Sequence, residues 1–224
     1  MNKAGFTCDY SYARETCVLK LKGLSFGYDA DRLLIKACSK DFNSRLIYGI
    51  YGSSGAGKSS FARVLAGYHT PLSGTISLVC GNTITLLPTR PHPVGIISQN
   101  PELDFDARIT LQKSFAVFGH APTEDLCATF GLEAAWLKRK PTMLSGGQLQ
   151  RCNIVRTLML KPSFVIADEI STMLDAISQA ELFRSLLEVR KRDKFGLIVM
   201  SHDRKLLDLV CDCVLDFSSL SNMC

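Results

Sequence analysis

The sequence has little of what marks a membrane-spanning, secreted or nucleic-acid-binding protein. It contains no run of the roughly 18 apolar residues that a helix needs to cross a bilayer, so the chain itself is not expected to span a membrane. Its first residues, Met1 to Tyr10, lack the apolar core of a secretory signal. The excess of positive charge is small and scattered, 26 Lys and Arg against 21 Asp and Glu, so no nucleic-acid partner is expected.

The nine cysteines form neither the spacing of a metal site nor an obvious disulfide framework. They are odd in number and spread along the chain, and Cys211 and Cys213 are the only close pair. A structural zinc site needs four ligands at suitable spacing, which the sequence does not offer. Because there is also no secretory signal, we expect buried thiols in a reducing, cytosolic compartment.

The length of 224 residues fits one substantial domain, which we expect at 17–224 after a poorly ordered segment at 1–16. Short apolar runs at 46–50, 94–98, 163–167 and 197–200 are typical of buried parallel strands, and helical patterns lie between them. This alternation predicts an α/β fold with a mostly parallel core sheet that is covered on both faces.

Two regions depart from this alternation. Residues 17–22 have the pattern of a half-buried strand, and residues 75–87 form a short β region punctuated at Gly81, so a small antiparallel β subdomain is expected. From about 100 to 160 the apolar positions favour helices, and prolines separate the segments. We expect this stretch to be a helical insertion into the core.

The segment from Gly52 to Ser59 matches the pattern of a phosphate-binding loop, in which four residues separate a glycine from Gly-Lys-Ser. It lies between a buried strand and a helical pattern, which is the context that such a loop requires and that a chance match would lack. Glycines let backbone N–H groups turn inward around phosphate oxygens. Lys58 is then expected to neutralise the β- and γ-phosphates, and the Ser59 hydroxyl to ligate Mg²⁺.

Polar side chains follow three of the expected strands. Asp168 and Glu169 come after 163–167, Gln99 after 94–98 and His202 shortly after 197–200. At a strand end beside a phosphate loop, Asp168 is placed to hold Mg²⁺ through water, and Glu169 to deprotonate the attacking water. Gln99 is placed to contact Mg²⁺ or water, and His202 to reach a γ-phosphate. Taken alone, each would more often be a structural or surface residue; the phosphate loop favours the functional interpretation.

The pentapeptide Leu144–Gln148 lies upstream of Asp168 and opens a helical pattern. With it, the motifs stand in the order and spacing of ABC transporter ATPase subunits, which the chain resembles from about Cys17 to Phe217. The resemblance implies that ATP and Mg²⁺ are bound between two subunits. Ser145 and Gly147 of one subunit would then touch the γ-phosphate held by the phosphate loop of the other.

The resemblance also implies a role for each motif. Tyr28 matches the aromatic residue that stacks on adenine, and Asp175 ends the D-loop. The implied catalytic residues are Lys58, Gln99, Glu169 and His202, and the implied metal ligands are Ser59, Gln99 and Asp168. The implied nucleotide-binding residues are Tyr28, Gly52, Ser53, Ser54, Gly55, Ala56, Gly57, Lys58, Ser59, Ser60, Ser145, Gly146, Gly147, Gln148 and Asp175.

Two further features indicate a branch of the family. Residues 140–143, before the pentapeptide, are similar to those of importers, and residues 52–63 resemble the oligopeptide and nickel uptake group. Ile170 departs from the usual proline after the glutamate, and Met173 replaces a small D-loop residue. The sequence ends soon after His202, without the C-terminal extension of longer peptide-group members, so a compact subunit, paired with a longer and non-identical partner, is one expectation.

The function implied by the resemblance is ATP hydrolysis that powers uptake of peptide, nickel or a metal chelate at the cytoplasmic face of the membrane. The expected partners are a second ATPase subunit, identical or not, integral membrane permease subunits docked around Glu102–Arg108, and indirectly a substrate-binding protein. The alternative is a soluble ABC ATPase that acts in iron–sulfur cluster assembly, since those ATPases are also short and single, or in another non-transport role. A non-hydrolysing regulator is disfavoured because Lys58, Asp168, Glu169 and His202 are all present.

Overall fold

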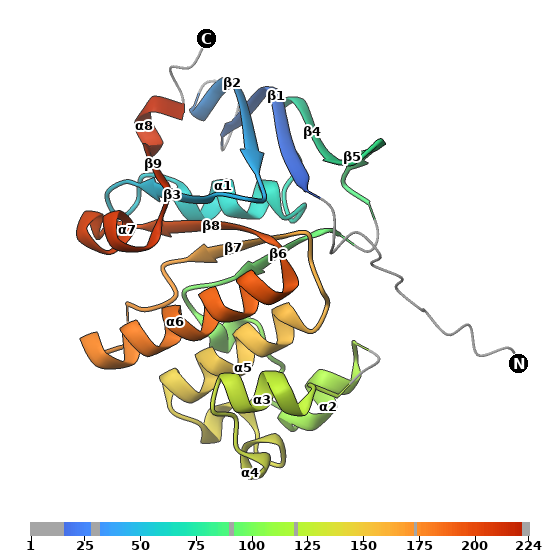
Figure 1. The fold of residues 1–224 in the computed structure, drawn as a ribbon, viewed down its shortest axis with the longest axis vertical. Helices are drawn as coiled ribbons and strands as arrows, with labels where there is room; N and C mark the ends of the chain where they lie inside the picture. Colours follow the sequence, from blue (N-terminus) through green and yellow to red (C-terminus); the bar gives the residue numbers. More distant parts are fainter. Residues whose placement is uncertain (1–15, 28–31, 90–91, 119–120, 173, 221–224) are drawn as a thin grey trace, which may run out of the picture.

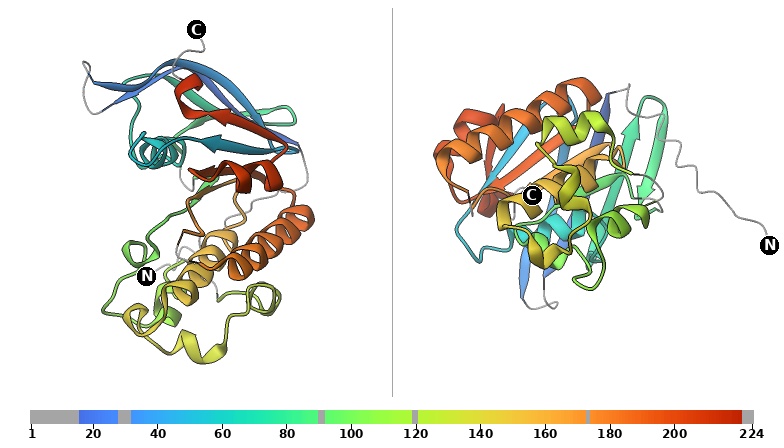
Figure 2. Two further views of the ribbon diagram at one scale, coloured as in Figure 1. Left: turned by 90° about the vertical axis from the view of Figure 1, so that its left-hand side faces the viewer. Right: turned by 90° about the horizontal axis from the view of Figure 1, so that it is seen from below.

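The computed structural model describes residues 16–27, 32–89, 92–118, 121–172 and 174–220. The elements are stacked in layers, with an antiparallel sheet at one end, a parallel sheet in the middle and a group of short helices at the other end (Figures 1 and 2). The segment 1–15, most of the part expected to be poorly ordered, lies outside the described residues.

The core sheet is wholly parallel and has the strand order β6-β7-β8-β3-β9. Its central strands, β7 and β8, are buried along their whole length, as their unbroken apolar sequences predict. The expected parallel core sheet is therefore confirmed. Its strands are β3 (Ile47–Tyr51), β6 (Val94–Ile97), β7 (Phe164–Asp168), β8 (Gly196–Ser201) and β9 (Cys213–Asp216).

The second sheet is antiparallel and has the order β2-β1-β4-β5. The β4–β5 hairpin turns at Gly81, whose φ of 53° lies in the left-handed region that glycine adopts without strain. The expected antiparallel subdomain is thus confirmed, with one strand, β2, that the sequence pattern did not indicate. The strands are β1 (Cys17–Gly27), β2 (Leu33–Asn43), β4 (Ser73–Cys80) and β5 (Thr83–Leu87).

The expectation that all cysteines are free thiols is wrong at two positions. Cys17 and Cys80 lie directly opposite each other on β1 and β4 and form a disulfide, although 63 residues separate them in the sequence. The strand pairing brings them together, and spacing along the chain carries no sign of it. Five described cysteines are free, and burial raises the pKa of two of them, Cys152 and Cys211, to about 12, so these thiols stay protonated.

Helices cover both faces of the core sheet. On one face, α1 (Lys58–Leu65) lies between the core sheet and the antiparallel sheet, and its Phe61 and Leu65 are fully buried there. The other face is covered by α5, α6 and α7, which form a separate apolar cluster with the sheet. These helices span Gly146–Leu158, Ala176–Asp193 and Arg204–Val210.

Between β6 and β7 the described residues form helices only, at the end of the molecule far from the antiparallel sheet (Figure 2, left). None of the helices in the described ranges is long and apolar enough to cross a membrane. The short helices of this region are η2 (Pro101–Leu103), α2 (Leu111–Ala116), α3 (Glu124–Thr129), α4 (Ala134–Leu137) and η3 (Pro141–Met143). A further short helix, α8 (Phe217–Leu220), follows β9.

Candidate functional site

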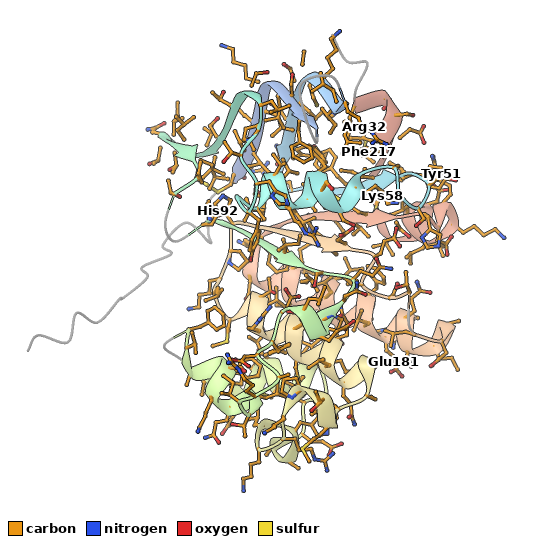
Figure 3. The ribbon with its side chains drawn as sticks, turned by 180° about the vertical axis from the view of Figure 1, so that it is seen from behind. Arg32, Tyr51, Lys58, His92, Glu181 and Phe217 are labelled. Carbon is orange, nitrogen blue, oxygen red and sulfur yellow. A yellow bond between two sulfur atoms is a disulfide. The ribbon has the colours of Figure 1, made fainter. Side chains whose placement is uncertain are left out.

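The phosphate-binding loop runs from the end of β3 to the start of α1, where Lys58 lies (Figure 3). Gly55 and Gly57 have φ values of 80° and 105°, which residues with a side chain rarely adopt, so the glycines are required for this turn. Gly57 is the N-cap of α1 and has no side chain to cap the helix. The first N–H groups of α1 are therefore left to bind an anion, as a phosphate site needs.

Lys58 is buried, with 4% of its side chain exposed. Its Nζ donates to the carbonyl oxygens of Gly52 at 2.7 Å and Ser53 at 3.0 Å, both within the loop. It also lies 3.0 Å from Oε1 of Glu169, whose side chain is 9% exposed. The loop thus fixes a positive charge where the phosphates of a nucleotide would lie.

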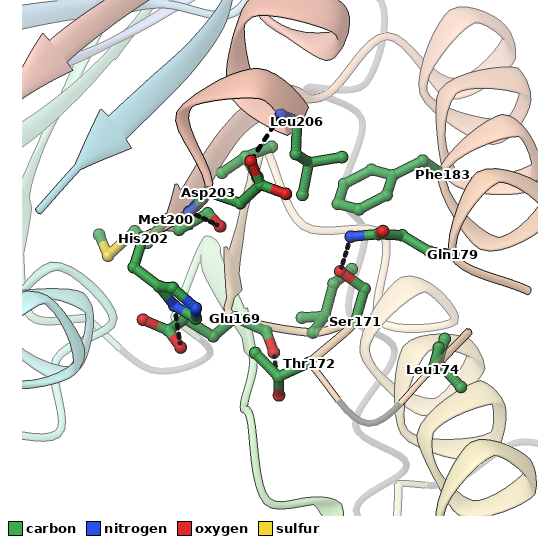
Figure 4. Close-up of a pocket in the computed structure, with 13 residues that line it drawn as sticks. Glu169, Ser171, Thr172, Leu174, Gln179, Phe183, Met200, His202, Asp203 and Leu206 are labelled. Carbon is green, nitrogen blue, oxygen red and sulfur yellow. Dashed lines mark hydrogen bonds and ion pairs between the residues drawn. The ribbon is translucent and has the colours of Figure 1, made fainter. Parts of the chain in front are cut away.

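Glu169 and His202 meet at the ends of two neighbouring strands, β7 and β8 (Figure 4). Oε2 of Glu169 lies 3.1 Å from Nδ1 of His202. The backbone of Glu169 is left-handed, with a φ of 49°, and its N–H donates to the carbonyl of Met200 at 3.0 Å. Such a conformation is uncommon for a residue with a side chain and is found often at functional sites.

Asp168, the last residue of β7, is 3% exposed. Burial raises the pKa of this carboxyl above its ordinary value, while a hydrogen bond with the Ser59 side chain opposes that rise. Its Oδ1 is buried and has no hydrogen-bond partner among the described residues. A carboxylate with an oxygen to spare beside a hydroxyl fits Mg²⁺, which typically takes one or two protein ligands together with phosphates and water.

Nothing in the described part of the chain would hold a metal ion by itself, since no group of three or more His, Cys, Asp or Glu residues is placed to do so. The fit to Mg²⁺ therefore involves a nucleotide that supplies further ligands. Ser59 and Asp168 are brought together as expected, whereas Gln99 makes no hydrogen bond with either of them. Gln99 instead lines a small pocket beside Gly146 and Thr172, formed by the segments that follow β6 and β7 and by the start of α5.

A pocket of about 190 Å³ lies beside Glu169 and His202 (Figure 4). Its wall combines polar groups with apolar side chains from α6 and α7, and a hydrogen bond of 2.7 Å joins Gln179 to Ser171 across it. The D-loop thus contributes to the same pocket as the two expected catalytic residues. The lining residues are Glu169, Ile170, Ser171, Thr172, Leu174, Gln179, Phe183, Val199, Met200, Ser201, His202, Asp203 and Leu206.

The pentapeptide forms the N-terminus of α5. Ser145 is the N-cap: its hydroxyl accepts from the N–H of Gln148 at 3.3 Å, and its own N–H donates to the Gln148 side chain at 3.1 Å. This capping box fixes the start of the helix, and Ser145 and Gly146 remain exposed at its tip. No hydrogen bond or ion pair of the described residues joins the pentapeptide to the phosphate loop. The two lie on helices that cover opposite faces of the core sheet.

Of two further residues expected to bind the nucleotide, the structure describes Asp175 but not Tyr28. Asp175 is the N-cap of α6, and its carboxylate accepts from the N–H groups of Ile177 and Ser178 at 3.0 Å each and from the Ser178 hydroxyl at 2.7 Å. These bonds lower the pKa of Asp175, so the carboxylate is already engaged in starting the helix. Tyr28 and Met173 lie outside the described residues.

One polar network of α5 was not foreseen from the sequence. Gln150 donates to the carbonyl of Ser98 at 3.2 Å, and Asn153 donates to the Asp104 carboxylate at 2.9 Å. Arg156 donates to Asp104 and Asn153, and its guanidinium lies 4.5 Å from the centre of the Phe105 ring. Polar residues three apart on an otherwise apolar helix face were the available signal. The network ties the loop after β6, which contains Gln99, to the helix that begins at Ser145.

Comparison with known proteins gives a family match. A family model described as ABC transporter matches residues 35–172. The "Energy-coupling factor transporter ATP-binding protein EcfA1" of Mesomycoplasma hyopneumoniae is 32% identical over an alignment of 200 residues that covers 83% of this chain and 72% of that protein. The "Nickel import system ATP-binding protein NikE" of Staphylococcus aureus is 29% identical over 194 residues, 85% of this chain and 82% of that protein.

Solved structures show the same fold. The structure of cbiO1 from Clostridium perfringens, described as part of the ABC transporter complex cbiONQ, has a TM-score of 0.70 at 24% identity and covers 88% of this chain and 83% of that one. A dimeric ATP-binding cassette, MJ0796 bound to ADP and Pi, has a TM-score of 0.72 at 20% identity, with 88% and 93% covered.

The family model spans more than half of the chain, and the EcfA1 relative is matched over most of both sequences. The phosphate loop, the pentapeptide and the carboxylates at the end of β7 all lie within the matched regions. The chain belongs to the ABC transporter family, as an ATP-binding subunit that hydrolyses ATP to drive transport.

Proposed function

We propose that this subunit powers an importer for nickel, a metal chelate or peptide. The names of the two relatives support transport, and that of NikE describes nickel import. The soluble alternative, a role in iron–sulfur cluster assembly, has no support from these names.

The observation that carries the catalytic part of the proposal is the convergence of four side chains, one from the start of α1 and three from the ends of β7 and β8. Lys58, Asp168, Glu169 and His202 come together although 144 residues separate the first from the last. Lys58 would neutralise the phosphates of ATP, and Asp168 and Ser59 would hold Mg²⁺, which supplies charge neutralisation when bound. Glu169 would accept the proton of the attacking water, and His202 would hold the Glu169 carboxylate and the terminal phosphate.

The exposed position of Ser145 supports a second subunit in the site. A capped but exposed helix start can offer N–H groups to a phosphate only outside its own subunit, because its own phosphate loop is not in contact with it. Two subunits facing head to tail would place Ser145 and Gly147 of each on the ATP held by the other. This arrangement would make ATP binding favour the closed pair, and hydrolysis its release.

We assign docking to a membrane subunit to the loop Glu102–Arg108 of this chain, which would lie at the cytoplasmic face of the membrane. Leu103 is 76% exposed there, next to the buried Pro101, and Val117 at the end of α2 is 75% exposed. These exposed apolar side chains would be buried against the membrane subunit on docking. The network around Asp104 and Arg156 would transmit a movement of this loop to α5.

Replacing Glu169 by Gln tests the catalytic assignment. The variant keeps the shape of the site but cannot accept a proton, so ATP binding should persist while turnover falls by roughly 10²- to 10⁴-fold. ATP binding by calorimetry and phosphate release measure the two effects separately. As a control, Glu188→Gln alters an exposed carboxylate on α6, outside the site, and should leave turnover by the isolated subunit unchanged. Wild-type turnover by the Glu169→Gln variant would refute the assignment.

A further inference from the structure

Lys58 and Glu169 form a buried ion pair that the proposed chemistry does not require. Their charged atoms lie 3.0 Å apart, and their side chains are 4% and 9% exposed. Under the proposed function each has a separate task, Lys58 toward phosphate and Glu169 toward water. In the structure each neutralises the other instead, and a buried charge that loses its partner is strongly destabilised.

Lys58 has no donor to spare. An ammonium group has three N–H donors, and three acceptors surround Nζ: the carbonyls of Gly52 at 2.7 Å and Ser53 at 3.0 Å, and Glu169 at 3.0 Å. A phosphate oxygen that takes a hydrogen bond from Lys58 must therefore replace one of the three. The two carbonyls belong to the backbone of the loop, whereas the carboxylate is on a side chain with rotatable bonds. Glu169 is thus the acceptor that can leave.

Glu169 also has a second partner that can keep it in place. Its other oxygen lies 3.1 Å from Nδ1 of His202, whose side chain is 52% exposed and has room to follow (Figure 4). The Glu169 backbone is held by its N–H bond to Met200. Displacement of the carboxylate from Lys58 is therefore a rotation of one side chain and leaves β7 where it is.

We propose that the Glu169 carboxylate competes with a phosphate of the nucleotide for Lys58. This inference rests on the proposed function. A phosphate takes the place of the carboxylate at Nζ of Lys58, and the carboxylate, still beside His202, becomes free to accept a proton from water. The ion pair thus keeps the base engaged until a phosphate is bound. The same ion pair lowers the affinity of the subunit for nucleotide.

The test compares two variants by calorimetric titration with ADP, which carries the β-phosphate that Lys58 would contact but has no γ-phosphate to be hydrolysed. Glu169→Gln removes the negative charge, and Glu169→Asp keeps the charge but draws it back from Lys58 by one methylene group. If Glu169 competes directly, both variants should bind ADP about tenfold more tightly than the wild type, since hydrogen bonds to charged groups are of this strength. The control Glu188→Gln, which alters an exposed carboxylate on α6, should bind ADP as the wild type does.

Two outcomes overturn the proposal. Unchanged or weaker ADP binding by both variants would show that the ion pair does not oppose the nucleotide. Tighter binding by Glu169→Gln alone would show a general effect of charge instead of competition for Lys58. Thermal unfolding of each variant verifies that it is folded. If the wild type binds neither ADP nor ATP, the proposed function itself is refuted. If the wild type hydrolyses ATP but the Glu169 variants bind ADP as the wild type does, only the competition is refuted.

Discussion

At the scale of single residues, Asp168 combines a buried charge with an oxygen that no described residue satisfies. Such a carboxylate favours the binding of a cation, and its burial lowers the stability of the folded state. Since burial raises its pKa in the folded protein, the folded state binds a proton at Asp168 more readily than the unfolded state does. The contribution of Asp168 to stability is therefore greatest below the ordinary Asp pKa and is lost as the pH rises through the raised value.

Asp168→Asn should consequently stabilise the protein at neutral pH when divalent metal is chelated. The expected gain is on the order of 1 kcal/mol, because the variant no longer buries an incompletely paired charge. The gain should disappear as the pH falls below the ordinary Asp range, where the wild-type carboxyl is protonated as well. Urea unfolding at several pH values measures it. A variant that is less stable than the wild type at neutral pH would contradict the assigned cost of burial.

The turn of the predicted phosphate loop and the helix after it could be predicted from the sequence because their pattern is local. Gly55, Gly57 and Lys58 lie within one turn, and the turn requires their types at those positions. The contact between Lys58 and Glu169 did not follow, since it joins residues from β7 and α1 that meet only in the folded chain. No local pattern records which acceptor a buried ammonium takes.

At the scale of elements, α5 joins the pentapeptide to the loop after β6. Asn153 is fully buried and makes two of the bonds of this network, to Asp104 at 2.9 Å and to Arg156 at 2.8 Å. Its side chain therefore keeps a carboxylate and a guanidinium in fixed positions. The helix and the loop are expected to move as one unit, so that Gln99 and Ser145 change position together.

Asn153→Ala should lower the free energy of unfolding by about 2–3 kcal/mol, because it leaves buried polar groups without partners. Asn82→Ala, in the exposed turn between β4 and β5, is the matched control and should change stability by less than about 0.5 kcal/mol. Urea unfolding of both variants provides the measurement. Equal effects of the two substitutions would show that the network does not hold the loop on α5.

The strands of the core sheet could be predicted because their apolar runs are unbroken, as in β7 and β8. Strand β2 could not, since its pairing with β1 contains register shifts that break the alternation of buried and exposed residues. For the same reason β1 extends to Gly27, beyond the expected 17–22. The Cys17–Cys80 disulfide follows from the register of β1 on β4, which no single segment specifies.

At the scale of the whole molecule, the separation of the phosphate loop from the pentapeptide is the central feature. α1 and α5 lie on opposite faces of the core sheet, so under the proposed function one subunit would present two incomplete halves of a nucleotide site. Two subunits in a head-to-tail pair would complete both sites, with a twofold axis between them. The large, charged side chain in Ser145→Arg should therefore leave ATP binding by a single subunit nearly intact but prevent closure of a pair in which both subunits carry the substitution.

Mixing two inactive variants tests this account most directly. Lys58→Ala damages the phosphate loop and Ser145→Arg the pentapeptide, so neither should hydrolyse ATP alone. Because a mixed pair has one intact site, made of Lys58 from one subunit and Ser145 from the other, an equimolar mixture should recover up to about one quarter of wild-type turnover. Turnover of the mixture equal to the average of the two separate variants would contradict the shared site.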